Sequence, residues 1–376
     1  MTHSAQSLRT RDASLDLLRI VIMLYIVCGH CIFHGEMTES AGITGYNALL
    51  LTLVEGFTNV HVNCFVLISG YFLSERDTFK FKKLFSLYAQ VWFWSVFLYA
   101  IFALTGYTPF GAKELIKACL PFTQQQYWFF TTYLLLYMVS PFLNILIRAM
   151  DRRQHLTLLL VYFGVFVFLQ NLVFWRDFTL VGAHDPLHFM FLYLAAAYMR
   201  RYPHSAHRHR WGRIYVGSCL LAAAYKYAVS YITTPIFGEP VGETLCSGYN
   251  SVFTVLGSIA FFAFFRDLRI DNKKLAAVIT FIAPLTFGVY LIHDNNYMRP
   301  FLWKTLLDSA QFAGSPCCVP LVIVTGIAVF AACALPEYLR RKLFERLPIN
   351  HYIAVWGDKV SSFAERCVTR MLKEKV

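Results

Sequence analysis

The chain has 376 residues, of which 57% are hydrophobic and only 15% are charged. Soluble domains carry about a quarter of their residues as charged side chains, so this composition excludes an ordinary soluble protein and indicates a polytopic membrane protein. The formal net charge is +12, but the lysines and arginines are spread over several loops and form no single patch, which argues against a nucleic-acid partner.

Ten mostly apolar runs are long enough, or nearly long enough, to cross a bilayer as helices. Basic and basic-poor connections alternate between them, and the positive-inside rule then places both termini in the cytoplasm. We therefore expect an all-α membrane bundle, with a cytoplasmic leader at 1–14, a membrane domain at 15–340 and a cytoplasmic amphipathic tail at 341–376. The predicted transmembrane helices cover residues 15–34, 49–73, 84–105, 127–147, 156–175, 186–200, 212–232, 249–265, 275–294 and 316–336.

The first apolar run has ionisable residues at both ends. Asp16 and Arg19 lie near its start at a spacing that allows them to pair on a helix, and His30 lies near its end. Arg19 and His30 fall on nearly the same helix face, about 17 Å apart along the axis. Ionisable groups within a bilayer are costly and usually face the interior of a bundle, where they serve function. This run is therefore the first candidate for an active site.

Four stretches, in this order, resemble acyltransferase family 3, a family of integral-membrane acyltransferases. The resemblance extends from about residue 12 to residue 340, which is nearly the whole predicted membrane domain. The stretches are Leu15-Asp-Leu-Leu-Arg19 followed after ten residues by His30, Phe65-Val-Leu-Ile-Ser-Gly-Tyr71, Tyr127-Trp-Phe with the segment from Tyr133 to Asn144, and Phe287-Gly-Val-Tyr-Leu-Ile-His293.

The resemblance implies a membrane O-acyltransferase, and an O-acetyltransferase in particular, that moves an acyl group from cytoplasmic acyl-CoA to a hydroxyl of an extracytoplasmic or lipid-linked polysaccharide. The co-substrate would be acetyl-CoA or another acyl-CoA, with no bound cofactor. The protein would be a multi-pass protein of a bacterial plasma membrane, in contact with the donor, the carbohydrate and the bilayer. A transporter or flippase of a glycolipid or small anion, using Arg19, Lys226 and His30, is the alternative from another functional class.

The two ends of the first run fit the two ends of an acyl-CoA. Arg19 would meet a phosphate or the polar start of the long arm, and His30 would lie near the thioester. A neutral imidazole suits a general base for a poorly nucleophilic hydroxyl, and an acyl-enzyme route through His30 stays open. Residues expected to support these two are Asp16, as the partner of Arg19, and His61, Asn63, His293 and Asp294, which would orient the base or stabilise the oxyanion.

Two cytoplasmic connections carry basic residues that have two interpretations. The side chains anchor the protein to lipid headgroups, or they bind the phosphates of an acyl-CoA. The chain has no glycine-rich phosphate loop, so any phosphate binding would depend on side chains. These residues are Arg76, Lys80, Lys82, Lys83, Arg152 and Arg153.

Lys226 lies within a predicted span and also has two interpretations. It either serves function or extends its amine to the outer interface, with Glu239 and Glu243 as natural partners. The tail at 351–376 repeats apolar residues with a helical period beside a basic face, which predicts an amphipathic helix on the inner leaflet.

Other polar and aromatic residues give less specific signals. Trp128, Tyr133 and Tyr137 are typical of an aromatic belt at the membrane interface, or stack on an acceptor sugar. The loop at 200–213 holds histidines among arginines, without a carboxylate or a cysteine. This pattern favours a basic cytoplasmic loop, and we expect no metal site.

Overall fold

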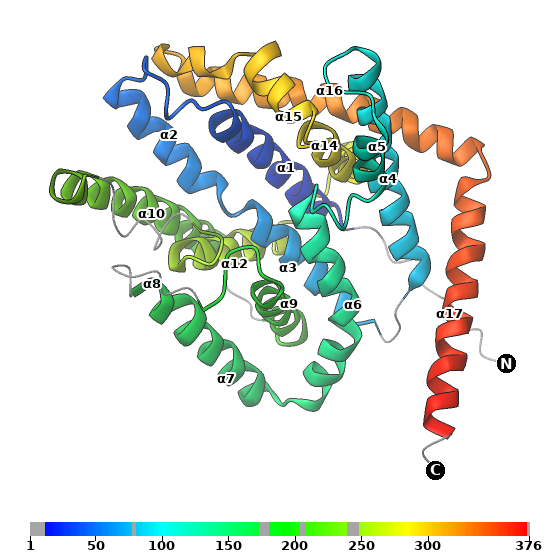
Figure 1. Cartoon of the computed structure of the whole chain (residues 1–376). Helices are drawn as coiled ribbons and strands as arrows, with labels where there is room; N and C mark the ends of the chain where they lie inside the picture. The colour runs from blue at the N-terminus through cyan, green and yellow to red at the C-terminus, as the bar shows by residue number, and fades with distance from the viewer. Residues whose placement is uncertain (1–11, 77–79, 173–179, 204–207, 239–247, 374–376) are drawn as a thin grey trace.

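The computed structural model describes residues 12–76, 80–172, 180–203, 208–238 and 248–373. Within these residues every regular element is a helix, which confirms the all-α prediction. Figure 1 shows one bundle of helices with the last helix, α17 (Ile349–Lys373), running along its side. Residues 1–11 of the predicted leader lie outside the described residues, as do Glu239 and Glu243.

Among the described residues, seven helical segments are long and apolar enough to cross a bilayer, against the ten that the sequence predicts. The other three predicted spans are helical too. Of these, α9 (Pro186–Arg201) and α12 (Val252–Arg266) are only 16 and 15 residues long, and α10 (Arg208–Phe237) is long but more polar. The total of ten spans and the cytoplasmic termini stay predictions.

The seven segments follow in chain order, with α9, α10 and α12 between the fifth and the sixth and with shorter helical pieces in other connections. The short pieces are α5 (Ala112–Cys119), α15 (Met298–Pro300), η3 (Phe301–Leu306) and η4 (Ser309–Gly314). The seven segments are α1 (Ala13–His34), α2 with α3 (Gly45–Thr58 and His61–Leu73), α4 (Phe81–Leu104), α6 (Trp128–Ala149), α7 with η1 and α8 (Arg152–Tyr162, Phe163–Leu169 and Gln170–Leu172), α13 with η2 and α14 (Lys273–Ile282, Ala283–Leu285 and Thr286–His293), and α16 (Cys318–Arg346).

Helix α1 lies in the middle of the bundle and belongs to two apolar cores. Asp12 begins it by accepting hydrogen bonds from the backbone N–H groups of Ser14 and Leu15, at 3.1 and 3.3 Å. The first half of α1 packs with α3 and α12, and the second half packs with α14 and α16. The buried apolar residues of the two halves are Leu15, Leu18 and Ile22 in the first core and Met23, Ile26, Val27, Cys28, Cys31 and Ile32 in the second.

Lys226 forms an ion pair between two helices. Its Nζ lies 2.8 Å from Oε2 of Glu55, so the pair joins α10 to α2, and both side chains are about 30% exposed. Because Glu55 precedes Lys226 by 171 residues, no sequence spacing pointed to this partner.

A fully buried carboxylate joins α4, α14 and α16. Glu337 on α16 accepts hydrogen bonds from Nε1 of Trp94 at 2.8 Å and from Nε2 of Gln90 at 3.2 Å, both on α4. Arg340, one turn further along α16, donates two hydrogen bonds to the same carboxylate, at 2.9 and 2.6 Å. Gly288 on α14 faces this group so closely that a Cβ added there would lie 2.2 Å from Cγ of Glu337.

Gly288→Ala is expected to destabilise the bundle by about 1–3 kcal/mol, because four hydrogen bonds prevent the Glu337 side chain from moving aside for the new methyl group. The matched control is Gly217→Ala on α10, where a Cβ meets nothing within 4 Å. Thermal unfolding of both variants in detergent checks this. Equal unfolding temperatures for the two variants would show that the contact between α14 and α16 is not tight.

Candidate active site

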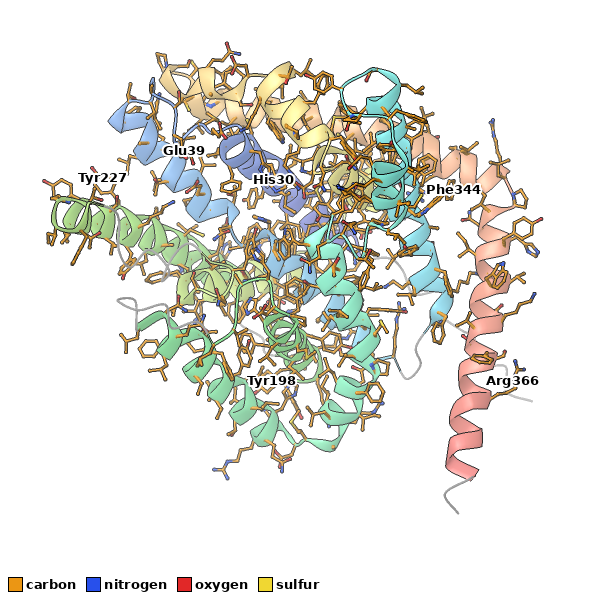
Figure 2. All side chains as sticks on the ribbon, viewed as in Figure 1. His30, Glu39, Tyr198, Tyr227, Phe344 and Arg366 are labelled. Atoms are coloured by element: carbon orange, nitrogen blue, oxygen red, sulfur yellow. The ribbon has the colours of Figure 1, made fainter. Side chains whose placement is uncertain are left out.

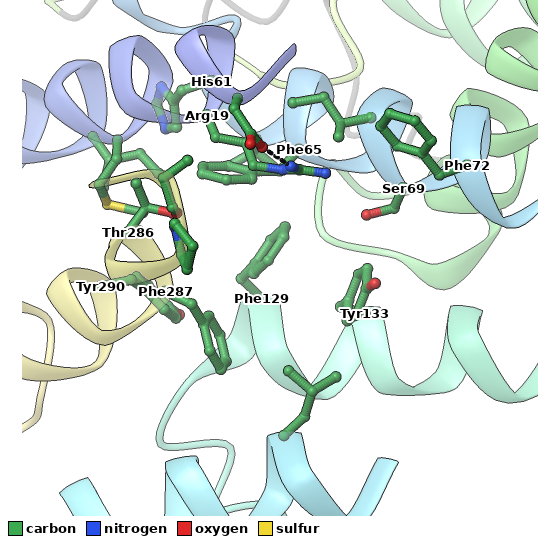
Figure 3. Close-up of a pocket in the computed structure, with 18 of the residues that line it drawn as sticks. Arg19, His61, Phe65, Ser69, Phe72, Phe129, Tyr133, Thr286, Phe287 and Tyr290 are labelled. Atoms are coloured by element: carbon green, nitrogen blue, oxygen red, sulfur yellow. Dashed lines mark hydrogen bonds and ion pairs between the residues drawn. The ribbon is translucent and has the colours of Figure 1, made fainter. Parts of the chain in front are cut away.

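An elongated cavity of about 890 Å³ runs alongside α1, between α3, α6 and α14. Its lining extends from Asp12, at the start of α1, to His30 near the end of that helix, so it follows most of the helix length. Figure 3 shows Phe129 and Tyr133 directed into this space from α6. The middle of the lining is apolar or aromatic, and includes Met23, Ile26, Phe65, Ile68, Phe129, Phe287 and Tyr290.

His30 lies at one end of the cavity, the outer end in the predicted topology, inside the bundle (Figure 2), and contacts a second histidine. Its Nδ1 is 3.0 Å from Nε2 of His293. Nδ1 of His293 is in turn 2.6 Å from the carbonyl oxygen of Val289, which can only accept a hydrogen bond. In the neutral pair, His293 therefore carries its proton on Nδ1, its Nε2 accepts from Nδ1–H of His30, and the lone pair of His30 is left on Nε2.

Asp294 brings a buried negative charge close to His30. Its Oδ1 lies 3.6 Å from Nδ1 of His30 and 3.6 Å from Nε2 of His34, which follows His30 by one helical turn. Arg299 donates to the same oxygen from Nε at 2.9 Å, and a second guanidinium N–H of Arg299 reaches the Asp294 backbone carbonyl at 3.0 Å. The carboxylate is thus held in place by Arg299, beside the imidazole but not hydrogen-bonded to it.

His30, His34 and Asp294 are also residue types that bind metal ions. One ligand atom from each lies within 4.8 Å of the others. However, Arg299 already pairs with the nearer oxygen of Asp294, and its positive charge opposes a cation at this position. The prediction that the chain binds no metal is neither supported nor contradicted by this geometry.

His61 and Asn63 both fix Tyr249, which also lines the cavity. His61 donates from Nδ1 to the carbonyl oxygen of Thr58 at 2.6 Å, and its Nε2 accepts from the Tyr249 hydroxyl at 3.3 Å. Asn63 donates to the backbone carbonyl of Tyr249 at 2.8 Å and does not itself line the cavity. The ring of Tyr249 stacks on Trp128, with 5.8 Å between ring centroids, and the two rings form an aromatic wall near His30.

The opposite end of the cavity, the inner end in the predicted topology, is basic. Arg19 forms an ion pair with the buried Asp16, and its guanidinium lies 5.7 Å from the ring centroid of Phe72. Lys83 lies over the ring of Tyr137 at 5.2 Å. The four basic residues that line this end are Arg19, Arg76, Lys83 and Arg200.

Only two of the six residues predicted to bind phosphate line this cavity. Arg76 and Lys83 line the cavity, whereas the other four do not; these are Lys80, Lys82, Arg152 and Arg153. Arg200 also lines the cavity, although the sequence analysis did not single out this residue. It donates to both oxygens of Glu75, at 2.8 and 2.9 Å, and nothing in the sequence distinguishes it from its basic neighbours before that contact is known.

The cavity therefore combines a cationic inner end, an apolar middle and an imidazole with a free lone pair at the outer end.

Comparison with protein-family models matches residues 12–335 to the acyltransferase 3 family, described as an acyltransferase domain. Comparisons with curated proteins and with solved structures gave no match. The matched region contains both ends of the cavity and all seven spanning segments except the last turns of α16. The chain belongs to the acyltransferase 3 family, and it is a membrane acyltransferase.

Proposed function

We propose that this acyltransferase moves an acyl group, normally acetyl, from cytoplasmic acyl-CoA to a hydroxyl of an extracytoplasmic or lipid-linked carbohydrate, with His30 as general base. One observation carries the proposal. The same cavity is lined by Arg19 and three further basic residues at one end and by His30 at the other, and Arg19 and His30 lie on one helix, α1. The charge pattern of the loops supports a cytoplasmic position for the basic end.

The cavity suits the shape and polarity of an acyl-CoA. The nucleotide carries several phosphate charges, which Arg76, Lys83 and Arg200 would attract at the inner end. The long arm is largely uncharged and would lie along the apolar middle. Arg19 and His30 are about 17 Å apart along the axis of α1, so a donor with its polar part near Arg19 can present its thioester near His30.

The tautomer of His30 suits general base catalysis. In the proposed reaction, Nε2 of His30 takes the proton of the acceptor hydroxyl as its oxygen attacks the thioester carbonyl. The tetrahedral intermediate then collapses, the C–S bond breaks, and the thiolate takes the proton from the imidazolium. His293 holds the ring through Nδ1, and the negative charge of Asp294 at 3.6 Å favours the transient imidazolium. An acyl-enzyme route would use the same lone pair.

His30→Ala is expected to lower acyl transfer and thiol release from acetyl-CoA by 10²- to 10⁴-fold, the usual contribution of a positioned base. Thiol release from the purified protein with an acceptor carbohydrate measures this, and the exposed His209→Ala serves as the matched control. Full thiol release by correctly inserted His30→Ala protein would contradict the mechanism. Glycolipid transport without any acyl transfer would favour the transporter alternative.

His293→Ala is expected to lower kcat by about 10- to 100-fold with little change in KM, because His30 loses the acceptor that fixes its tautomer. His293→Gln keeps an oxygen acceptor and should recover much of this loss. Steady-state kinetics of both variants separate the two parameters. An equal loss in both variants would mean that His293 acts through packing and not through its hydrogen bond.

Arg76→Gln and Lys83→Gln are each expected to raise the KM for acyl-CoA by roughly tenfold, because each would remove one charge-assisted contact to phosphate. Arg153→Gln, outside the cavity lining, should leave the KM unchanged and is the matched control. Kinetics at low ionic strength show the effect most clearly. If Arg153→Gln has the larger effect, the donor does not enter by this cavity.

A further inference from the structure

Helix α17 carries a row of exposed aromatic side chains. It has 25 residues, and it is not among the helical segments apolar enough to span a bilayer. Tyr352, Trp356 and Phe363 are 58%, 62% and 62% exposed. Their spacings of four and seven residues place them on one helix face. Exposure of three such rings to water is unfavourable in free energy, because their apolar surface stays hydrated.

Two basic side chains border this aromatic row on one side. Lys359 follows Trp356 by three residues and its Nζ lies 5.5 Å from the ring centroid of Trp356. Arg366 follows Phe363 by the same spacing, and both basic residues are exposed. Asp358 lies on the opposite face of the helix, because it is two residues from Trp356 and five from Phe363. The exposed aromatic face is therefore accompanied by positive charge and not by negative charge.

The position of α17 identifies what covers this face. Figure 1 shows α17 leaving the end of α16 at a steep angle and passing beside the start of α4, and the two helices pack together. Gly357 is buried against α4, where a Cβ would lie 2.8 Å from the Cα of Lys82. Because α4 is one of the candidate spanning segments, the part of α17 that packs beside its first turns lies at the level where that segment begins.

We propose that α17 binds the surface of the bilayer through anionic lipid. Tyr352, Trp356 and Phe363 lie at the boundary between headgroups and acyl chains, and Lys359 and Arg366 contact lipid phosphates or carboxylates. Aromatic rings with a basic border are the composition that suits this interface. The neighbouring lysines at the start of α4 place further positive charge on the same surface, which the anionic inner leaflet matches.

Hydrogen exchange of the full-length protein, measured by mass spectrometry in lipid nanodiscs, tests this without any acyl transfer assay. Amides of 349–373 should exchange roughly thirty-fold more slowly in discs with phosphatidylglycerol than in discs of phosphatidylcholine alone, since two basic residues each gain from the anionic surface. An undocked amphipathic helix of this length frays in water and exchanges quickly. Amides of α1 report whether the bundle itself is intact.

The double variant Lys359→Glu with Arg366→Glu should lose the difference between the two lipids, with exchange of α1 unchanged. Asp358→Asn, on the opposite face of α17, is the matched control and should keep the difference. Equal exchange of 349–373 in both lipids, or full protection of the double variant in anionic discs, would overturn the proposal. Because the readout does not depend on catalysis, its failure is distinguishable from failure of the proposed function.

Discussion

The packing of the bundle depends on one constraint, which is that the polar face of α1 must be kept away from lipid. Arg19 and His30 on α1 cannot face hydrocarbon without a large cost in free energy, and the apolar residues of the two halves of α1 pack into two apolar cores. The side that carries the two residues opens on the cavity between α3, α6 and α14. The position of α1 thus determines where the cavity lies and which of its ends is basic. The other groups of the candidate site lie around this helix.

A backbone carbonyl determines the chemical state of His30. The carbonyl oxygen of Val289 accepts a hydrogen bond from Nδ1 of His293, which fixes the proton of His293 and, through it, the proton of His30. With the protons in these positions, the lone pair on Nε2 of His30 stays available to a hydroxyl group in the cavity. Asp294 is held by Arg299 and provides negative charge nearby without taking the His30 proton for itself. Charge and hydrogen bonding at the site are therefore supplied by different residues.

The sequence predicted the helical fold and the two ends of the cavity, because Arg19, His30 and their spacing are properties of one helix. It did not predict Tyr249 or Arg200 at the site, since each depends on contacts between segments far apart in the chain. Asn63, expected to orient the base or stabilise the oxyanion, donates a hydrogen bond to the backbone carbonyl of Tyr249. The number of spans is also uncertain from hydropathy, because the helices at 186–201 and 252–266 are too short to be judged by length.

The contact between Gly357 and Lys82 has a consequence for the lipid environment of the enzyme. Lys82 is followed by Lys83, which lines the inner end of the cavity, and Tyr137 holds the same segment from the other side through the carbonyl oxygen of Lys80. A helix seated on the inner leaflet would therefore share a stretch of backbone with the donor entrance. In such an arrangement the charge of the membrane becomes a determinant of donor affinity, so the same protein would differ in apparent KM between membranes of different composition.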